Sequence, residues 1–257
     1  MTPEILLASF TFQAFLLFAR LGSAIFVFPA LSDNSIPARA RLVLAAGATL
    51  VLLPLLHGQL PGLPAQSSQL VFMVGSEIVI GILLGLSARL YMAALSFAGE
   101  MIAFMAGFQS ASLFDPQSGA STVAPTIFLT LTAGVLILVL NLHHALIQGV
   151  VASYTVFVPG HLPPVGNVTT AVVNIFAQFT ALGLQIAAPV VIAGFLVNLA
   201  FGIFNRLIPQ IQMFFLTVPL SITLSMLLLA VALTSVFTLF TARLQDNLLI
   251  MQQDANQ

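Results

Sequence analysis

The chain has 257 residues, of which 60% are hydrophobic and 5% charged, and its mean hydropathy is +1.12. A soluble domain needs about a quarter or more of its surface charged, so this composition indicates a protein that lies in lipid or in a large apolar assembly. The net charge of −1 excludes nucleic acid as a partner, and the absence of cysteine excludes disulfides, thiolate chemistry and zinc–cysteine sites.

Long apolar runs follow one another along the chain, and each predicts a membrane helix or a broken helix. None of them shows the alternation of polar and apolar residues that is typical of a membrane β-strand. We therefore predict an all-α, polytopic fold with about six hydrophobic helical segments, some of them broken. The runs span residues 5–31, 42–56, 69–106, 123–158, 168–204 and 213–242.

The placement of arginine predicts the orientation of these segments. Arg39, Arg41 and Arg206 lie in loops that six passes put on one side of the membrane, and the positive-inside rule makes that side cytoplasmic. The proline-rich loops at 57–68 and 159–167 then face the other side, together with both termini. Arg20 and Arg89 do not follow the rule, because they lie inside apolar runs.

The last two runs are too long for simple spans. Residues 168–204 would form a helix of roughly 55 Å at about 1.5 Å per residue, whereas the hydrocarbon core is about 30 Å thick. Two alternatives remain open. Either the helices break, with Pro189 and Pro219 as the kink sites, or they extend beyond the bilayer and bury their apolar faces on other proteins.

Polar groups inside the apolar runs are candidates for ion pairs, helix contacts or the lining of a conduit. Glu77 and Arg89 lie about three turns apart on one predicted helix, so each needs a partner elsewhere. Asn198 and Asn205 share a helix face, which favours hydrogen bonds between helices. The candidate polar and ion-pair residues are Glu77, Arg89, Glu100, Asn198, Asn205 and Arg206.

Two glycines form a second kind of candidate site. Gly81 and Gly85 have the spacing that lets two helix backbones approach closely. Incidental glycines in a membrane helix are an equally good interpretation of this pair.

A polar island at residues 107–122 interrupts the apolar sequence. Non-helical backbone survives at membrane depth only when it is buried in protein or lines a wet cavity. Apolar bulk could close a pore, the glycines could let the segment move, and the proline keeps it from becoming helical. The sequence therefore predicts a pore plug, with an ordinary inter-helix loop as the alternative. Its candidate residues are Gly107, Phe108, Leu113, Phe114, Asp115, Pro116 and Gly119.

Several stretches of the chain resemble one family, the FliR family, which is the flagellar branch of the type III secretion export-gate proteins. The resemblance covers nearly the whole chain. Its most specific parts are the loop Ser-Ile-Pro-Ala-Arg-Ala-Arg, which ends at Arg41, and the run Leu-Phe-Asp-Pro-Gln-Ser-Gly, which ends at Gly119. The other stretches are Arg20-Leu-Gly-Ser-Ala-Ile-Phe-Val-Phe-Pro29, Ala98-Gly-Glu100 and Asn205-Arg-Leu-Ile-Pro-Gln210.

This resemblance implies a subunit of a bacterial export gate in the inner membrane, at the flagellar basal body. Such a gate assembles with FliP-type and FliQ-type subunits and an FlhB-type switch subunit, as a tapered spiral of long kinked helices around a closed pore. Unfolded flagellar proteins pass through that pore. Residues 1–167 would be the FliP-like part and residues 168–257 the FliQ-like hairpin and tail, and the family's plug maps onto residues 107–122.

Two other functions compete with a gate subunit. One is a subunit of a small-molecule membrane transporter or channel, in which a broken helix forms the substrate site. A transporter would more often contain internal repeats, and we detect none. The other is an intramembrane enzyme, but the chain has no His-Glu-x-x-His motif, no Gly-x-Ser-x-Gly elbow and no nucleophile–base pair. We therefore expect no enzymatic activity and no cofactor.

Overall fold

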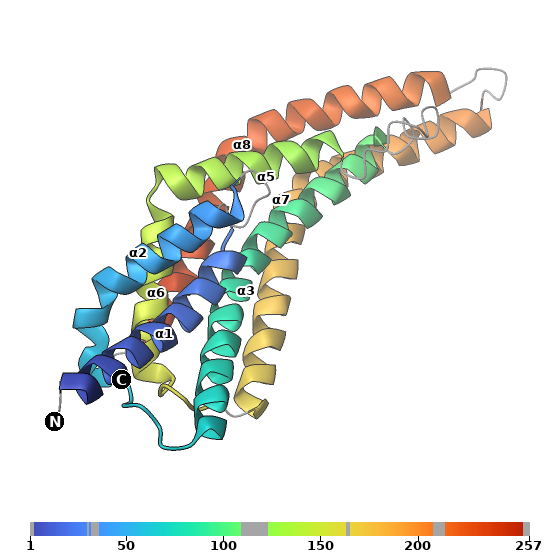
Figure 1. Cartoon of the computed structure of the whole chain (residues 1–257). Coiled ribbons are helices and arrows are strands. Elements are labelled where there is room, and N and C mark those ends of the chain that lie inside the picture. Colours follow the sequence, from blue (N-terminus) through green and yellow to red (C-terminus); the bar gives the residue numbers. More distant parts are fainter. Residues whose placement is uncertain are drawn as a thin grey trace. The chain divides into compact units, whose positions relative to one another are not determined.

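The computed structural model describes residues 3–29, 31, 36–108, 123–162, 165–207 and 214–253 (Figure 1). Over these residues the chain forms α-helices and one short 3₁₀ helix, η1, with no β-strand. The elements are α1 (Pro3–Val27), α2 (Ala38–Leu56), η1 (His57–Gln59), α3 (Ser67–Ala106), α5 (Ala124–Val139), α6 (Leu142–Val156), α7 (Val165–Leu207) and α8 (Phe214–Gln253).

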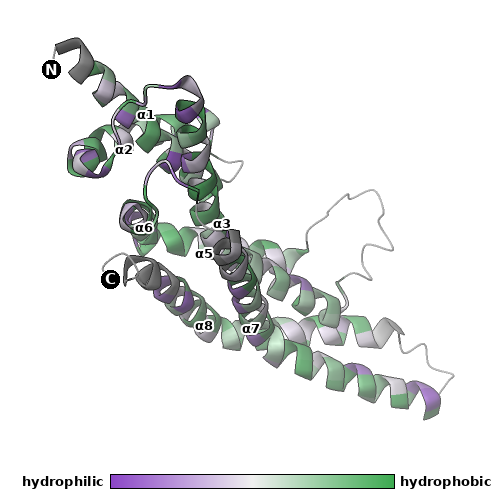
Figure 2. Cartoon of the chain, turned by 90° about the horizontal axis from the view of Figure 1, so that it is seen from below, coloured by the Kyte–Doolittle hydropathy of each residue, from purple (hydrophilic) through white to green (hydrophobic). Residues whose placement is uncertain are grey.

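Five of these helices are long and apolar enough to cross a membrane, and the bent pair α5–α6 is a sixth candidate. Figure 2 shows hydrophobic residues along all of the helices, with hydrophilic residues only scattered among them. The predicted all-α, polytopic fold of about six apolar segments is therefore confirmed.

The run at 123–158 is a broken segment. α5 and α6 are bent by 72° relative to each other. Asn141 lies at the break with a φ of 57°, a left-handed conformation that asparagine tolerates better than most residues. The break therefore lies at the first polar residue after a long apolar stretch.

The other possible breaks are absent from the part of the chain that the structure describes. Pro189 lies inside α7 and Pro219 inside α8, and both helices continue through them. α7 has 43 residues, which corresponds to roughly 65 Å. Neither proline therefore interrupts its helix.

The chain divides into two compact units, each made of segments that are distant in sequence. Unit 1 comprises Met1–Leu90, Val135–Ile175 and Leu244–Gln257, and unit 2 comprises Tyr91–Gly134 and Phe176–Arg243. These are units of packing. The predicted division into residues 1–167 and 168–257 is a different one, because it rests on resemblance to FliP-type and FliQ-type subunits. It stays a prediction.

In unit 1, α1 and α3 run parallel and approach closely. A Cβ atom at Gly81 would overlap the Arg20 carbonyl oxygen and the Ser23 hydroxyl. One turn later, a Cβ atom at Gly85 would lie 2.7 Å from the Val27 Cβ. The structure thus places both glycines of the small-residue pair against α1.

In unit 2, α3 and α7 also run parallel. The Tyr91 hydroxyl donates a hydrogen bond of 3.1 Å to Gln178 Oε1. Further along, a Cβ atom at Gly183 would lie 2.9 Å from the Ala94 carbonyl oxygen. The two helices therefore pack backbone to backbone, as small residues allow in membrane proteins.

We expect Gly81→Ala to destabilise unit 1, because the new methyl group overlaps the backbone of α1. Overpacking of this kind costs about 1–3 kcal/mol. Gly75→Ala is the matched control on the same helix, because nothing lies within 4 Å of its Cβ position. The measurement is the thermal unfolding midpoint of the chain, purified with any subunits that accompany it. A midpoint for Gly81→Ala at or above that of Gly75→Ala would contradict the close approach.

Candidate functional site

A buried ion pair joins α1 to α3 in unit 1. Arg20 Nε lies 2.6 Å from Glu77 Oε2, and Arg20 Nη2 lies 3.1 Å from Glu77 Oε1. Both side chains are completely buried. The planar guanidinium thus meets the carboxylate through two parallel hydrogen bonds, which is the strongest geometry for such a pair.

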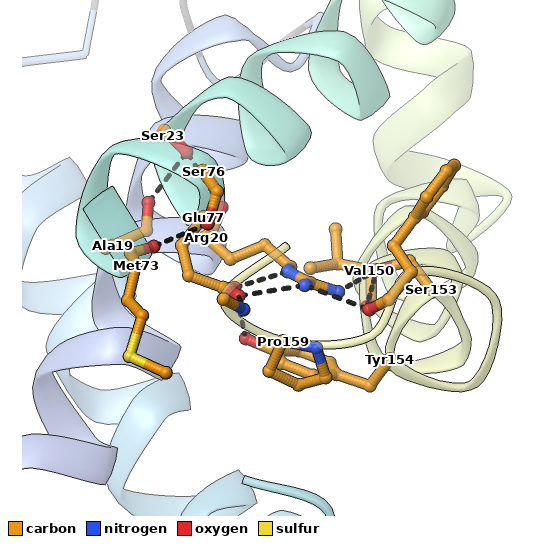
Figure 3. Close-up of polar contacts among 12 residues, drawn as sticks. Ala19, Arg20, Ser23, Met73, Ser76, Glu77, Val150, Ser153, Tyr154 and Pro159 are labelled. Carbon is orange, nitrogen blue, oxygen red and sulfur yellow. Dashed lines mark hydrogen bonds and ion pairs between the residues drawn. The ribbon is translucent and has the colours of Figure 1, made fainter. Parts of the chain in front are cut away.

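Further groups complete the hydrogen bonding of this pair (Figure 3). The Arg20 guanidinium also donates to Ser153 Oγ at 3.0 Å and to the Phe157 carbonyl oxygen at 3.2 Å. It lies 3.8 Å from the centre of the Tyr154 ring, which adds a cation–π contact. The Gly160 amide donates to Glu77 Oε1 at 3.1 Å. We call this set of residues the Arg20 network, and it ties α1, α3, α6 and the turn after α6 together.

Glu77 is among the residues predicted to need a partner, but the sequence does not identify Arg20 as that partner. In the sequence, Arg20 is only a charge inside an apolar run. Two opposite charges within otherwise apolar helices were the available signal, because each needs compensation there. The spacing of Glu77 and Arg89 along one helix excludes an ion pair between them, but it does not show which other helix supplies the partner of Glu77.

The other two charged candidates on α3 lie in a different environment. Arg89 and Glu100 are both exposed, and neither forms an ion pair with the described part of the chain. Arg206 is likewise exposed, near the end of α7. The structure therefore brings only Glu77, among the predicted charged residues, into a buried pair.

A cleft of about 420 Å³ lies in unit 2, where the end of α3, the end of α7 and the start of α8 meet. We call it the tip cleft. Its apolar lining comes from Phe104, Met105, Phe201 and Val218, and its polar lining from Asn198, Asn205, Thr217 and Ser221. The structure thus brings the two predicted asparagines together at one cleft, on the exposed side of α7.

The tip cleft also contains the first residue of the polar island. Gly107 lines it and has a φ of 81°, a left-handed conformation that glycine adopts without strain. α3 ends at the residue before it. Phe108 is half-buried. The remaining plug candidates lie outside the described residues: Leu113, Phe114, Asp115, Pro116 and Gly119.

We expect single substitutions in the ion pair to be severely destabilising. Arg20→Met leaves the Glu77 carboxylate buried without compensation, which costs about 3–5 kcal/mol. The double variant with Glu77→Met removes both charges, and its loss should be clearly smaller than the sum of the two single losses. Arg89→Met is the control, since Arg89 is exposed.

The measurement is the amount of folded chain in the membrane at equal expression, together with its thermal midpoint. A loss in the double variant that equals the sum of the two single losses would show that the two charges are not coupled.

Comparison with known proteins assigns the chain to a family. The family of bacterial export proteins, family 1, matches residues 11–247. The flagellar biosynthetic protein FliR of Caulobacter vibrioides is 35% identical over 235 residues, which is 91% of this chain and 94% of that protein. The FliR proteins of Bacillus subtilis and Escherichia coli are 31% and 30% identical, over 88% and 79% of this chain and over 88% and 77% of their own lengths.

The family match at residues 11–247 includes residues of both units and the Arg20 network, so it concerns the whole architecture and not one segment. The chain therefore belongs to family 1 of the bacterial export proteins, together with these flagellar biosynthetic proteins FliR.

Proposed function

We propose that this chain is a non-enzymatic subunit of the core export gate of a bacterial flagellar type III secretion system. It would lie in the inner membrane, at the flagellar basal body, and help to form the closed pore through which unfolded flagellar proteins pass. The observation that carries the proposal is the polar island at 107–122. It lies between α3 and α5, two apolar helices, in a chain whose relatives are flagellar biosynthetic proteins.

The island has the composition that a plug requires. A resting pore wide enough for an unfolded chain must not leak ions, and a hydrophobic constriction excludes water and ions by dewetting. Phe108, Leu113 and Phe114 supply apolar bulk. Gly107 and Gly119 supply backbone freedom. Pro116 keeps the middle of the segment from becoming helical and favours extended backbone at the preceding aspartate.

The exposed surface of α7 supports an assembly of several subunits. Large apolar side chains that are about half exposed or more follow one another along this helix in unit 2, and the helix is roughly twice as long as a bilayer is thick. Lipid can cover only part of such a helix, so other subunits must cover the rest. These side chains are Ile192, Phe195, Leu196, Leu199, Ile203, Phe204 and Leu207.

We propose FliP-type and FliQ-type gate subunits as these partners, with an FlhB-type switch subunit and the exported proteins as further ones. In this proposal residues 1–167 are the FliP-like part. Residues 168–257, which contain most of α7 and all of α8, are the FliQ-like hairpin and tail.

Deleting residues 110–115 should increase ion leakage through the assembled complex, because the deletion removes the apolar bulk of the plug. Assembly should persist, because the helices that pack the units are intact. The measurement is the decay of an imposed ion gradient across vesicles that contain the purified complex. Leu63→Ala, in the exposed segment after η1, is the control. Vesicles that stay as tight as wild type with a normally assembled deletion variant would refute the plug.

Single cysteines test the proposed orientation cleanly, because the chain has none. Leu207 lies at the end of α7 and is 70% exposed, and Gly62 lies in an exposed segment with nothing within 4 Å of its Cβ position. An impermeant thiol reagent added outside the inner membrane should label Gly62→Cys. It should label Leu207→Cys only after the membrane is opened. Denatured samples give the maximum labelling of each variant, and the reverse pattern would show that the chain is inverted.

A further inference from the structure

In unit 1, α2 leaves most of its apolar surface uncovered. Together with η1 it forms a candidate membrane span, Ala38–Gln59, and 17% of the most apolar stretch of this span is buried, compared with 50% for α1. The buried side chains of α2 lie on the side that packs against α1, and they are Ala45, Thr49 and Leu56. The rest of its surface therefore meets something outside the described chain.

The exposed surface of α2 is wide. At about 100° per residue, the exposed side chains from Leu42 to Leu55 point over an arc of about 220°. A helix that packs on one neighbour needs an apolar stripe of about 100°, so a single partner helix would leave much of this arc uncovered. The residues of this exposed arc are Leu42, Val43, Leu44, Ala46, Gly47, Leu50, Val51, Pro54 and Leu55.

No polar side chain interrupts the exposed arc. The one hydroxyl in this stretch, on Thr49, is buried and donates to a carbonyl oxygen of its own helix at 2.7 Å. Two longer helices differ in this respect, since α3 exposes Arg89 and Glu100, and α7 exposes Gln185 and Asn198. Such groups need partners or water at membrane depth, whereas a purely apolar surface needs neither. The exposed arc of α2 therefore suits acyl chains.

The length of α2 and the polar residues at its ends match a bilayer. The span of 22 residues is about 33 Å long, close to the hydrocarbon thickness of about 30 Å. At its beginning Arg39 is exposed, and the Arg41 guanidinium donates to the Ile36 carbonyl oxygen at 3.0 and 3.2 Å. At its other end His57 and Gln59 are exposed. The apolar surface thus stops on both sides where headgroups and water begin, with the arginines at the predicted cytoplasmic end.

We propose that bilayer lipid, and no partner subunit, covers the exposed arc of α2 in the assembled complex. α2 is then the helix through which unit 1 faces the membrane, and partner subunits cover surfaces that carry polar groups, such as those of α3 and α7. The inference rests on the proposed function for the presence of the inner membrane and of partner subunits.

Spin labels on single cysteines test the proposal in the intact complex, reconstituted into vesicles of phosphatidylethanolamine and phosphatidylglycerol. Ala46→Cys and Val51→Cys carry labels near the middle of the span, on sides of α2 that differ by about 140°. Both residues are exposed. Collisions of each label with oxygen, which dissolves in lipid, and with a water-soluble nickel chelate are measured. We expect the ratio of oxygen to nickel collisions at both positions to be several-fold higher than for Gly62→Cys, the reference in the exposed segment after η1.

The two collision rates together identify what covers each side of α2. Rare collisions with both reagents at position 46 or 51 would show that protein covers that side, and frequent collisions with the nickel chelate would show that water does. Either result would overturn the proposal. Each label is measured in a complex that has kept its co-purified subunits, so that a defect in assembly is not mistaken for exposure to lipid.

A photoreactive side chain gives an independent measurement. The residue p-benzoylphenylalanine replaces Leu50, which is 70% exposed on α2, or Ile192, which is 61% exposed on α7. After illumination of the reconstituted complex, mass spectrometry identifies the attached molecule. We expect attachment to phospholipid from position 50 and to a co-purified subunit from position 192. Attachment from position 50 to a subunit would overturn the proposal.

These measurements separate the inference from the proposed function. A wild-type chain that purifies alone as a stable monomer contradicts the gate subunit itself, and attachment from position 192 only to lipid contradicts the coverage of α7 by partner subunits. Protein at position 50, in a complex that contains its partner subunits, contradicts only the inference about α2.

Discussion

Hydrogen bonding away from water is the constraint on which the rest of this structure depends. With 5% of its residues charged, the chain meets mostly apolar surroundings, where an unpaired polar group costs several kcal/mol. The backbone meets this constraint by forming helices. Hydroxyl side chains meet it by bonding to carbonyl oxygens of their own helix, as Thr49 Oγ1 does to Ala45 and Ser87 Oγ does to Leu84, both at 2.7 Å. Hydroxyls inside apolar helices are thereby tolerated without partners on other helices.

The Arg20 network meets the same constraint for two full charges. A buried ion pair is seldom more stable than apolar residues of the same shape, so stability alone does not account for it. Its effect is to select one arrangement, because Arg20 can reach Glu77, Ser153 and the Phe157 carbonyl oxygen only in one register of α1, α3 and α6. Gly81 lies one turn from Glu77 and allows the close approach of α1 and α3. Close packing and charge pairing therefore fix the same helix–helix contact.

The sequence predicted the helices better than it predicted their partners. Apolar length and missing alternation are local properties, so they gave the helical segments correctly. The pairing of Glu77 with Arg20 joins residues 57 positions apart, and it depends on tertiary packing that no local pattern contains. Pro189 shows that a local preference can also mislead. Proline disfavours the interior of a helix, yet α7 continues through this residue. The tip cleft could be anticipated only in part, because the spacing of Asn198 and Asn205 indicates a shared face but not the helices around it.

In unit 2, two buried hydroxyl groups have no hydrogen-bond partner among the described residues. Gly99 lets α3 approach Thr126 so closely that a Cβ atom there would lie 2.5 Å from the Thr126 Cα. Thr126 Oγ1 is buried in this contact without a hydrogen-bond partner among the described residues. Ser221 Oγ is also buried without a hydrogen-bond partner among the described residues, although its residue lines the tip cleft. Each of these hydroxyls carries the cost of an unsatisfied buried polar group, about 1–3 kcal/mol. Close packing of the apolar helices in this unit therefore outweighs the loss of two hydrogen bonds.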